Sequence, residues 1–311
     1  MKTIVLCAIL LSMTSALAQQ PAGKRPKITG IDHVAFYTTS PNANLEKYVT
    51  ALGLASTLPL EPGQTQRFMV GSQWIGYSPA PDPKVTNRMD HVALRTDDCE
   101  AMRAYLGANG VKVPDSVTKG KDGSVSVMVK DPEGNSIEFV QPSPGIAVKV
   151  VKSGVSPSSP DPVSRRIIHA GFIARDRAAE DHFYKDILGF RPYWFGGMHS
   201  ERTDWVAIQV PDGTDWVEYM LNQPVNPDPR ISGVMNHVSL GVKDMNAAEM
   251  KLASHGWKAT AEEHSQMGRD GKLQLNMYDP ELTRIELMEF TPVDKPCCSE
   301  FTGPHPSETG S

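Results

Sequence analysis

Apolar and polar positions alternate over four short stretches of the chain, and each stretch carries one His between apolar neighbours. This alternation predicts four β-strands, at Asp32–Phe36, Asp90–Leu94, Ile168–Phe172 and Asn236–Leu240. After each strand the apolar residues recur first at helical spacing and then at strand spacing, which predicts one helix and about three further strands. The unit returns every 58 to 78 residues, so we expect four modules of one α+β plan.

The four modules are expected at residues 29–80, 88–141, 166–221 and 233–290. Their predicted helices end alike in modules one and three (Tyr-x4-Gly) and differently in modules two and four, which suggests a duplicated pair. The Pro- and Ser-rich stretch 142–165 predicts a linker between a first domain at 29–141 and a second at 166–291. Residues 292–311 are mostly polar and contain several prolines, so we expect a disordered tail.

Three of the four His strands have a partner strand in which one Glu stands between apolar residues. The pairs, 47 to 49 residues apart, are His91 with Glu138, His169 with Glu218 and His237 with Glu286. The fourth, His33, leads after 43 residues to Gly76 instead. Because side chains alternate between the faces of a strand, each His and Glu should lie opposite the apolar face that packs under the helix.

Composition and the first residues bound the classes of function. The 311 residues are 40% hydrophobic and 22% charged, with a net charge of −5 and no basic clusters, so we expect no nucleic-acid partner. Residues 1–18 combine a Lys, a short apolar run and Ala16-Leu17-Ala18, which predicts a cleaved signal peptide. The apolar run is too short for a stable membrane span. We therefore expect an exported protein, periplasmic or extracellular.

These motifs resemble the vicinal oxygen chelate superfamily, which includes glyoxalase I, extradiol dioxygenases and antibiotic-resistance proteins. The resemblance is carried by the four His strands and by three segments, Phe183–Phe190, Asp131–Glu138 and Asp279–Glu286. It spans nearly all of residues 29–291. It implies four βαβββ modules that pair into two glyoxalase-like cups, each with a metal at its centre.

Imidazole nitrogen and carboxylate oxygen suit Zn, Ni, Co, Mn or Fe(II), so we expect one divalent metal per cup. The second cup offers the four-ligand set of glyoxalase I-like relatives: His169, Glu218, His237 and Glu286. The first cup offers three candidates, His33, His91 and Glu138, the 2-His-1-carboxylate set of non-haem Fe(II) oxygenases. The sequence analysis favours the complete quartet as the main site.

On this basis we expect a glyoxalase-type lyase or isomerase acting on a small substrate that chelates the metal through vicinal oxygens. Glu218 or Glu286 would move a proton as general base. The first alternative is an Fe(II) extradiol-type ring-cleavage dioxygenase. The resemblance then implies an acid–base His at the position of Glu218, so this departure lowers the dioxygenase reading. The second alternative is a non-catalytic protein of the same fold that binds a small ligand.

Overall fold

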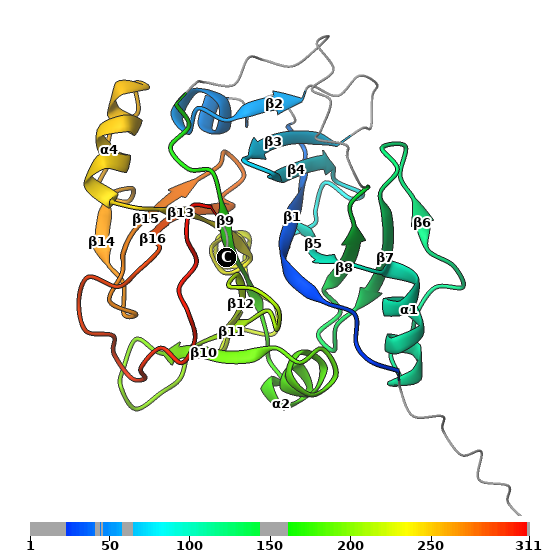
Figure 1. Ribbon diagram of the computed structural model, residues 1–311. Helices are drawn as coiled ribbons and strands as arrows, with labels where there is room; N and C mark the ends of the chain where they lie inside the picture. The colour runs from blue at the N-terminus through cyan, green and yellow to red at the C-terminus, as the bar shows by residue number, and fades with distance from the viewer. Residues whose placement is uncertain (1–22, 41–43, 45, 58–64, 144–160, 310–311) are drawn as a thin grey trace, which may run out of the picture.

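Two curved eight-stranded sheets make up the protein, one in each half of the chain (Figure 1). The computed structural model describes residues 23–40, 44, 46–57, 65–143 and 161–309. The predicted signal peptide lies outside the described residues. None of the helices in the described ranges is long and apolar enough to cross a membrane.

The first sheet is built from two modules with the order βαβββ. Its elements are β1 (Ile28–Thr38), the π-helical η1 (Glu46–Ala51), β2 (Ala55–Thr57), β3 (Gln66–Val70), β4 (Gln73–Pro79), β5 (Met89–Thr96), α1 (Cys99–Ala108), β6 (Thr118–Lys119), β7 (Val125–Lys130) and β8 (Ser136–Gln141). The strand order is β2-β3-β4-β1-β5-β8-β7-β6.

The second sheet repeats this plan. Its elements are β9 (Ile167–Ile173), α2 (Arg177–Asp181), the π-helical η2 (His182–Ile187), β10 (Arg191–Gly196), β11 (Trp205–Gln209), β12 (Trp216–Met220), α3 (Pro229–Met235), β13 (His237–Val242), α4 (Met245–Ser254), β14 (Ser265–Met267), β15 (Leu273–Tyr278) and β16 (Arg284–Glu289). The order β10-β11-β12-β9-β13-β16-β15-β14 matches that of the first sheet. The predicted α+β fold of four βαβββ modules in two cups is confirmed.

Strand pairing brings the His and Glu strands together at the centre of each cup. The first strands of two modules pair antiparallel, β1 with β5 and β9 with β13. The last strand of a module runs parallel beside its first strand, as β8 does beside β5 and β16 beside β13. The predicted ligands therefore lie on three central strands in the first cup and on four in the second.

The helices cover the face of each sheet that is opposite to these ligands. In α1 the buried residues are Cys99, Met102 and Leu106, a spacing that forms one helical stripe against β7 and β8. The side chain of Asp98 caps the helix by accepting a hydrogen bond from the Ala101 backbone N–H. Helix α4 packs on β15 and β16 in the same way. Helix α1 is thus the one helix predicted for the second module, and α3, which was not predicted from the sequence, begins at the Asp228-Pro229 signal.

The two domains contact each other through equivalent Asp-Pro-Glu turns. Tyr184 of the second domain donates a hydrogen bond to Asp131 of the first at 3.3 Å. Conversely, Tyr77 of the first domain donates to Asp279 of the second at 2.7 Å. All four side chains are buried, so these bonds fix how the two cups sit beside each other (Figure 1).

The expectation of a disordered tail is wrong for residues 292–309, which pack along the second domain. The Thr302 backbone N–H donates to the Tyr193 carbonyl at 3.0 Å, and the Phe301 ring lies 4.9 Å from that of Tyr193. A disulfide joins Cys297 to Cys298 in the same segment. The prediction failed because it relied on the polar overall composition of the tail. Aromatic contacts such as that of Phe301 and several backbone hydrogen bonds nevertheless hold the tail in place.

Candidate metal centres

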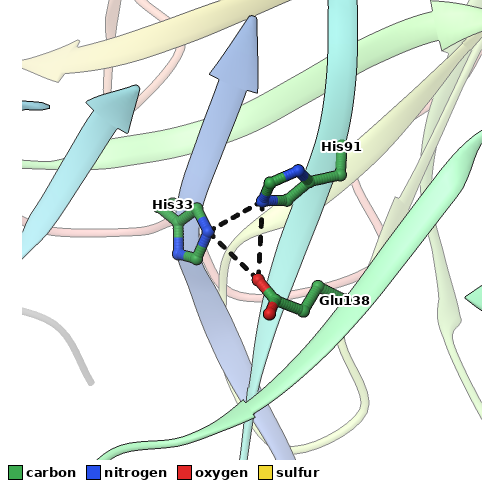
Figure 2. A group of neighbouring side chains, drawn as sticks. All are labelled: His33, His91 and Glu138. Atoms are coloured by element: carbon green, nitrogen blue, oxygen red, sulfur yellow. Dashed lines mark hydrogen bonds and ion pairs between the residues drawn. The ribbon is translucent and has the colours of Figure 1, made fainter. Parts of the chain in front are cut away.

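Three of the predicted ligands meet at the centre of the first cup. His33 comes from β1, His91 from β5 and Glu138 from β8 (Figure 2). The two imidazole Nε2 atoms are 3.0 Å apart, and Glu138 Oε2 lies 3.2 Å from His33 Nε2 and 3.4 Å from His91 Nε2. Figure 2 shows the three atoms at the corners of one triangle.

Both histidines of the first cup are held by an aspartate on the outer nitrogen. His33 Nδ1 lies 2.9 Å from Asp32 Oδ1, and His91 Nδ1 lies 3.3 Å from Asp90 Oδ2. A carboxylate only accepts hydrogen bonds, so each Nδ1 carries a proton and each Nε2 is directed inward. Three potential ligand atoms, two imidazole nitrogens and one carboxylate oxygen, thus face one another.

The triangle has the size that a divalent metal requires. Donor atoms about 2.1 Å from a metal are separated by ~3.0 Å at right angles and by ~3.4 Å in a tetrahedron, which brackets the observed 3.0 to 3.4 Å edges. A carboxylate behind each His is also the usual support of a metal-binding imidazole. The residues of the first cup therefore fit a divalent metal.

The aspartates reach the histidines because the backbone bulges beside each of them. The register between β1 and β5 skips Asp32, between Ile31 and His33, and it skips Asp90 on the other strand. An unpaired residue of this kind leaves the strict alternation of faces, so Asp and His can turn to the same side. Arg95 holds Asp32 from behind at 3.0 Å, and Tyr37 donates to Asp90 at 2.7 Å.

Electrostatics favour charged carboxylates in the first cup. Burial by itself would raise the pKa of Asp32, but the hydrogen bond and charge of His33 and the charge of Arg95 hold that pKa below its usual value. Burial is likewise outweighed at Asp90, where His91 and Tyr37 lower the pKa. The pKa of Glu138 is lowered by His33 against the same effect of burial. All three are anions at neutral pH.

Gly76 occupies in the first cup the position that Glu218 holds in the second. Gly76 pairs with Ala35 in the same register in which Glu218 pairs with Gly171. A Cβ at Gly76 would lie 2.5 Å from the Trp74 ring, which stacks on His33 with ring centroids 3.6 Å apart. The equivalent Trp216 stacks on His169 at 4.7 Å, so both cups have an indole beside the first histidine and only the second keeps the carboxylate.

The second cup brings together all four residues of the predicted quartet. His169 and His237 have their Nε2 atoms 3.1 Å apart, and Glu286 Oε2 is 3.1 Å from that of His169. Glu218 is more distant, at 3.6 Å from His237 Nε2 and 3.9 Å from His169 Nε2. His169, His237 and Glu218 alone could hold a metal ion by the closeness of their ligand atoms, as could the triad of the first cup.

A guanidinium shares the second cup with these residues. Arg284 Nη2 donates a hydrogen bond to His237 Nε2 at 2.6 Å, and Nη1 lies 4.0 Å from Glu286 Oε1. His237 Nδ1 bonds to the Met235 carbonyl at 3.0 Å, so Nε2 is the acceptor and its lone pair is directed at Arg284. A metal would need that same lone pair.

A lysine is buried on the other side of the second cup. Lys272 is fully buried, and its Nζ has no hydrogen-bond partner in the described part of the chain. The ammonium lies over three rings, 4.7 Å from the centroid of Trp216, 5.1 Å from Phe301 and 5.6 Å from Tyr193. Cation–π attraction therefore takes the place of hydrogen bonds, and the ring from the tail closes this cage.

Burial changes the proton affinities of the second cup. It raises the pKa of Glu218 to about 8, with a further contribution from the charge of Glu286. Burial would also raise the pKa of Glu286, but Arg284 and His169 hold it far below the usual value. The pKa of His237 is lowered, first by burial and then by the charge of Arg284. The cup thus contains one ionised carboxylate, one protonated carboxyl and two neutral rings.

The sequence analysis named all seven His and Glu residues but missed the groups that surround them. Asp32 and Asp90 were visible as the residues directly before two of the histidines, where the other two have Ile168 and Asn236. Arg284 was visible two residues before Glu286, hence on the same face of its strand. Lys272 gave no signal, because a lysine at the start of a strand is usually exposed.

Two family models match the chain, one over residues 30–139 and one over residues 168–274, and both are described as Glyoxalase/Bleomycin resistance protein/Dioxygenase superfamily. No curated protein sequence matches. Among solved structures, the Mn(II)-bound glyoxalase from Novosphingobium aromaticivorans is similar, with a TM-score of 0.61 and 17% identity over 85% of this chain and 83% of that one.

Two ring-cleaving enzymes are similar to the same extent. Homoprotocatechuate 2,3-dioxygenase from Brevibacterium fuscum has a TM-score of 0.62 and 17% identity over 92% of this chain and 85% of that one. The 2,3-dioxygenase LapB from Pseudomonas sp. KL28 has a TM-score of 0.63 and 13% identity over 92% and 96%. At these identities the structures show a shared fold. Together with the two family models, they establish that the chain belongs to the glyoxalase/bleomycin resistance/dioxygenase family, the vicinal oxygen chelate superfamily.

Proposed function

We propose that the protein is a metal-dependent enzyme whose reaction centre is the first cup and whose substrate is a small molecule with two adjacent oxygen donors. The observation that carries this proposal is the convergence of three potential ligand atoms from His33, His91 and Glu138, with edges of 3.0 to 3.4 Å. Their side chains are 6%, 15% and 16% exposed, so the site is in reach of solvent.

A divalent metal held there would supply Lewis-acid polarisation of substrate oxygens and, if redox-active, a path to oxygen. The protein's own groups define the rest of the site. Asp32 and Asp90 fix the orientation and tautomer of the two imidazoles. Trp74 covers one side of His33.

Ring cleavage by an Fe(II) dioxygenase is the reaction that this centre supports best. Two histidines and one carboxylate are the ligand set of non-haem Fe(II) oxygenases, and they leave room for both substrate oxygens and O2. The sequence analysis favoured a lyase or isomerase because it relied on the quartet of the second cup. Arg284 now lies against one member of that quartet, and the preference moves to the first cup.

A glyoxalase-type lyase or isomerase in the second cup is the second candidate. It is favoured by the presence of all four ligands and by Glu218, whose raised pKa of about 8 leaves it protonated at neutral pH. Glu218 and Glu286 would then be the catalytic carboxylates. The metal would be held by His169, Glu218, His237 and Glu286, which requires Arg284 to move away from His237.

Oxygen uptake separates the candidates. Protein reconstituted with Fe(II) is expected to consume O2 with at least one member of a catechol panel and to lose this activity in His91→Ala but not in His237→Ala. Conversion of a 2-oxoaldehyde adduct without oxygen uptake, abolished in His237→Ala, would support the lyase. Saturable catechol binding without turnover by any metal form would identify a ligand-binding protein instead.

We also propose that the chain is exported after cleavage of residues 1–18. The Cys297–Cys298 disulfide supports this, because disulfides persist in oxidising compartments. Mass spectrometry of the protein from its native host should find a mature chain beginning near Gln19. An intact N-terminus in the cytoplasmic fraction would contradict export.

A further inference from the structure

Two positions of the repeat carry cations in the second cup and serines in the first. Arg284 stands two residues before Glu286, and the same position before Glu138 is Ser136. Lys272 follows Asp270-Gly271, and the matching turn Asp122-Gly123 is followed by Ser124. The turns are equivalent in detail, since Gly268 N–H donates to the Lys272 carbonyl as Gly120 N–H donates to that of Ser124.

The guanidinium of Arg284 provides the positively charged partner for His237 Nε2 that a metal would otherwise provide. His237 presents a bare Nε2 lone pair, and Arg284 donates to it at 2.6 Å. His169 Nε2 lies 3.1 Å from both His237 Nε2 and Glu286 Oε2, so we place its proton on Nε2, where both acceptors are within reach. Neither imidazole then has a lone pair left for a metal.

His169 also lacks the support that its counterpart receives. In the first cup Asp32 bonds to His33 Nδ1, whereas Ile168 stands at that position in the second. The buried Nδ1 of His169 has no hydrogen-bond partner among the described residues. A metal-binding imidazole almost always donates its other N–H to an acceptor, so His169 is poorly arranged as a ligand.

The second cup contains two cations of its own. Arg284 and Lys272 face the carboxyl groups of Glu218, Glu286 and Asp270. A divalent cation entering this cup would be repelled by two fixed positive charges in a buried site, where such repulsion is weakly screened. The first cup has the hydroxyls of Ser124 and Ser136 at these two positions, and its one cation of this kind in the described part of the chain is Arg67, whose guanidinium lies over the Trp74 ring at 4.3 Å from the centroid.

We infer that Arg284 and Lys272 are built-in cations that replace the metal in the second cup, so that the chain takes one tight metal ion, in the first cup. The second cup is then a metal-independent site in which Arg284 and Lys272 supply the positive charge that a metal would otherwise bring. The inference rests on the proposed function only in assigning the tight ion to the first cup.

The test is a metal titration of the full chain, in wild type and in a variant whose second cup carries serine at positions 272 and 284, as the first cup does at the equivalent positions. Mn(II) is added to chelator-treated protein and bound ions are counted by electron paramagnetic resonance of free Mn(II). Wild type is expected to bind one ion tightly, and Arg284→Ser/Lys272→Ser two. The reverse change Ser136→Arg should remove the ion from the first cup. Arg230→Ser, at an exposed arginine of α3, serves as the matched control and should leave the count at one.

Two tight ions of similar affinity in wild type would overturn the inference, as would a folded Arg284→Ser/Lys272→Ser variant that still binds one. If the double variant does not fold, Arg284→Ser alone must raise the affinity of the second site at least tenfold, and no change there would overturn it. No ion in wild type but one in the double variant would contradict the proposed function while supporting this inference.

Discussion

The first and second cups share one strand frame and differ in what surrounds their ligands. The second cup has more candidate ligands, but its His237 is bonded to Arg284 and the outer nitrogen of His169 faces no acceptor. The first cup has one carboxylate fewer, yet each of its histidines is held by an aspartate.

This difference teaches that the number of ligand-type residues does not by itself identify a metal site. What decides is the state of the donor atoms: whether a lone pair points inward, and whether another cation already uses it. By this criterion the first cup is prepared for a metal and the second already contains cations of its own.

The largest effect on metal affinity is expected from removing the carboxylate of the first cup. Glu138→Gln should weaken metal binding by more than about 100-fold, because it removes a charged ligand and not only an outer support. Glu286→Gln, the matched change in the second cup, should leave the affinity of the tight ion within about threefold. Calorimetric titration with Mn(II) measures both, and equal losses would erase the contrast between the cups.

The aspartates behind the histidines should have the next largest effect. Asp32→Asn is expected to weaken metal binding in the first cup by about 10- to 100-fold, because the amide no longer fixes the tautomer of His33 as an anion does. Asp98→Asn, which alters only the cap of α1, is the control. An Asp32→Asn protein with wild-type affinity would show that the outer carboxylate is irrelevant.

The pH dependence of stability should differ between the cups in the metal-free protein. Glu218 has a raised pKa, so the folded chain keeps a proton that the unfolded chain releases, and stability falls as pH rises from about 4.5 to about 8. Glu218→Gln should remove this decline and raise Tm at pH 8 by at least about 2 °C.

The carboxylates of the first cup should change the pH dependence of folding stability in the opposite direction. Asp32, Asp90 and Glu138 have lowered pKa values, so they stabilise the folded chain above their usual pKa and lose this contribution as pH falls through the lowered values. Glu138→Gln should therefore flatten the acid limb of the Tm profile and leave the limb between pH 5 and pH 8 unchanged. The distinction between the cups would be refuted if Glu138→Gln changed the Tm profile between pH 5 and pH 8 and Glu218→Gln changed only its acid limb.

The smallest effect on stability is expected at the tail, residues 292–309, which covers the second cup. Phe301→Ala removes one ring from the cage around Lys272 and should cost about 1 kcal/mol of stability, a Tm decrease of about 2 °C. Metal binding in the first cup should not change. An altered count or affinity of bound metal would show that the tail acts on both cups.

Periodicity predicted the fold because every module must bury one apolar face under its helix. The stripe Cys99, Met102 and Leu106 and the alternation around His91 each have one arrangement that buries the apolar side. The candidate ligands followed from the same alternation.

The groups that distinguish the cups could not be obtained in this way. Asp32 and Asp90 reach the histidines through bulges that break the alternation, and Lys272 is buried only because residues from two other strands and the tail enclose it. The tail itself was missed because the contacts of the Phe301 and His305 rings and several backbone hydrogen bonds outweigh its polar composition. Contacts between segments distant in the sequence decide all three.

The most direct test of the account is the number of metal ions per chain, measured by elemental analysis of wild type, His91→Ala and His237→Ala purified from the native compartment. The account predicts one ion in wild type, none in His91→Ala and one in His237→Ala. An ion that persists in His91→Ala and disappears in His237→Ala would place the metal in the second cup and contradict it.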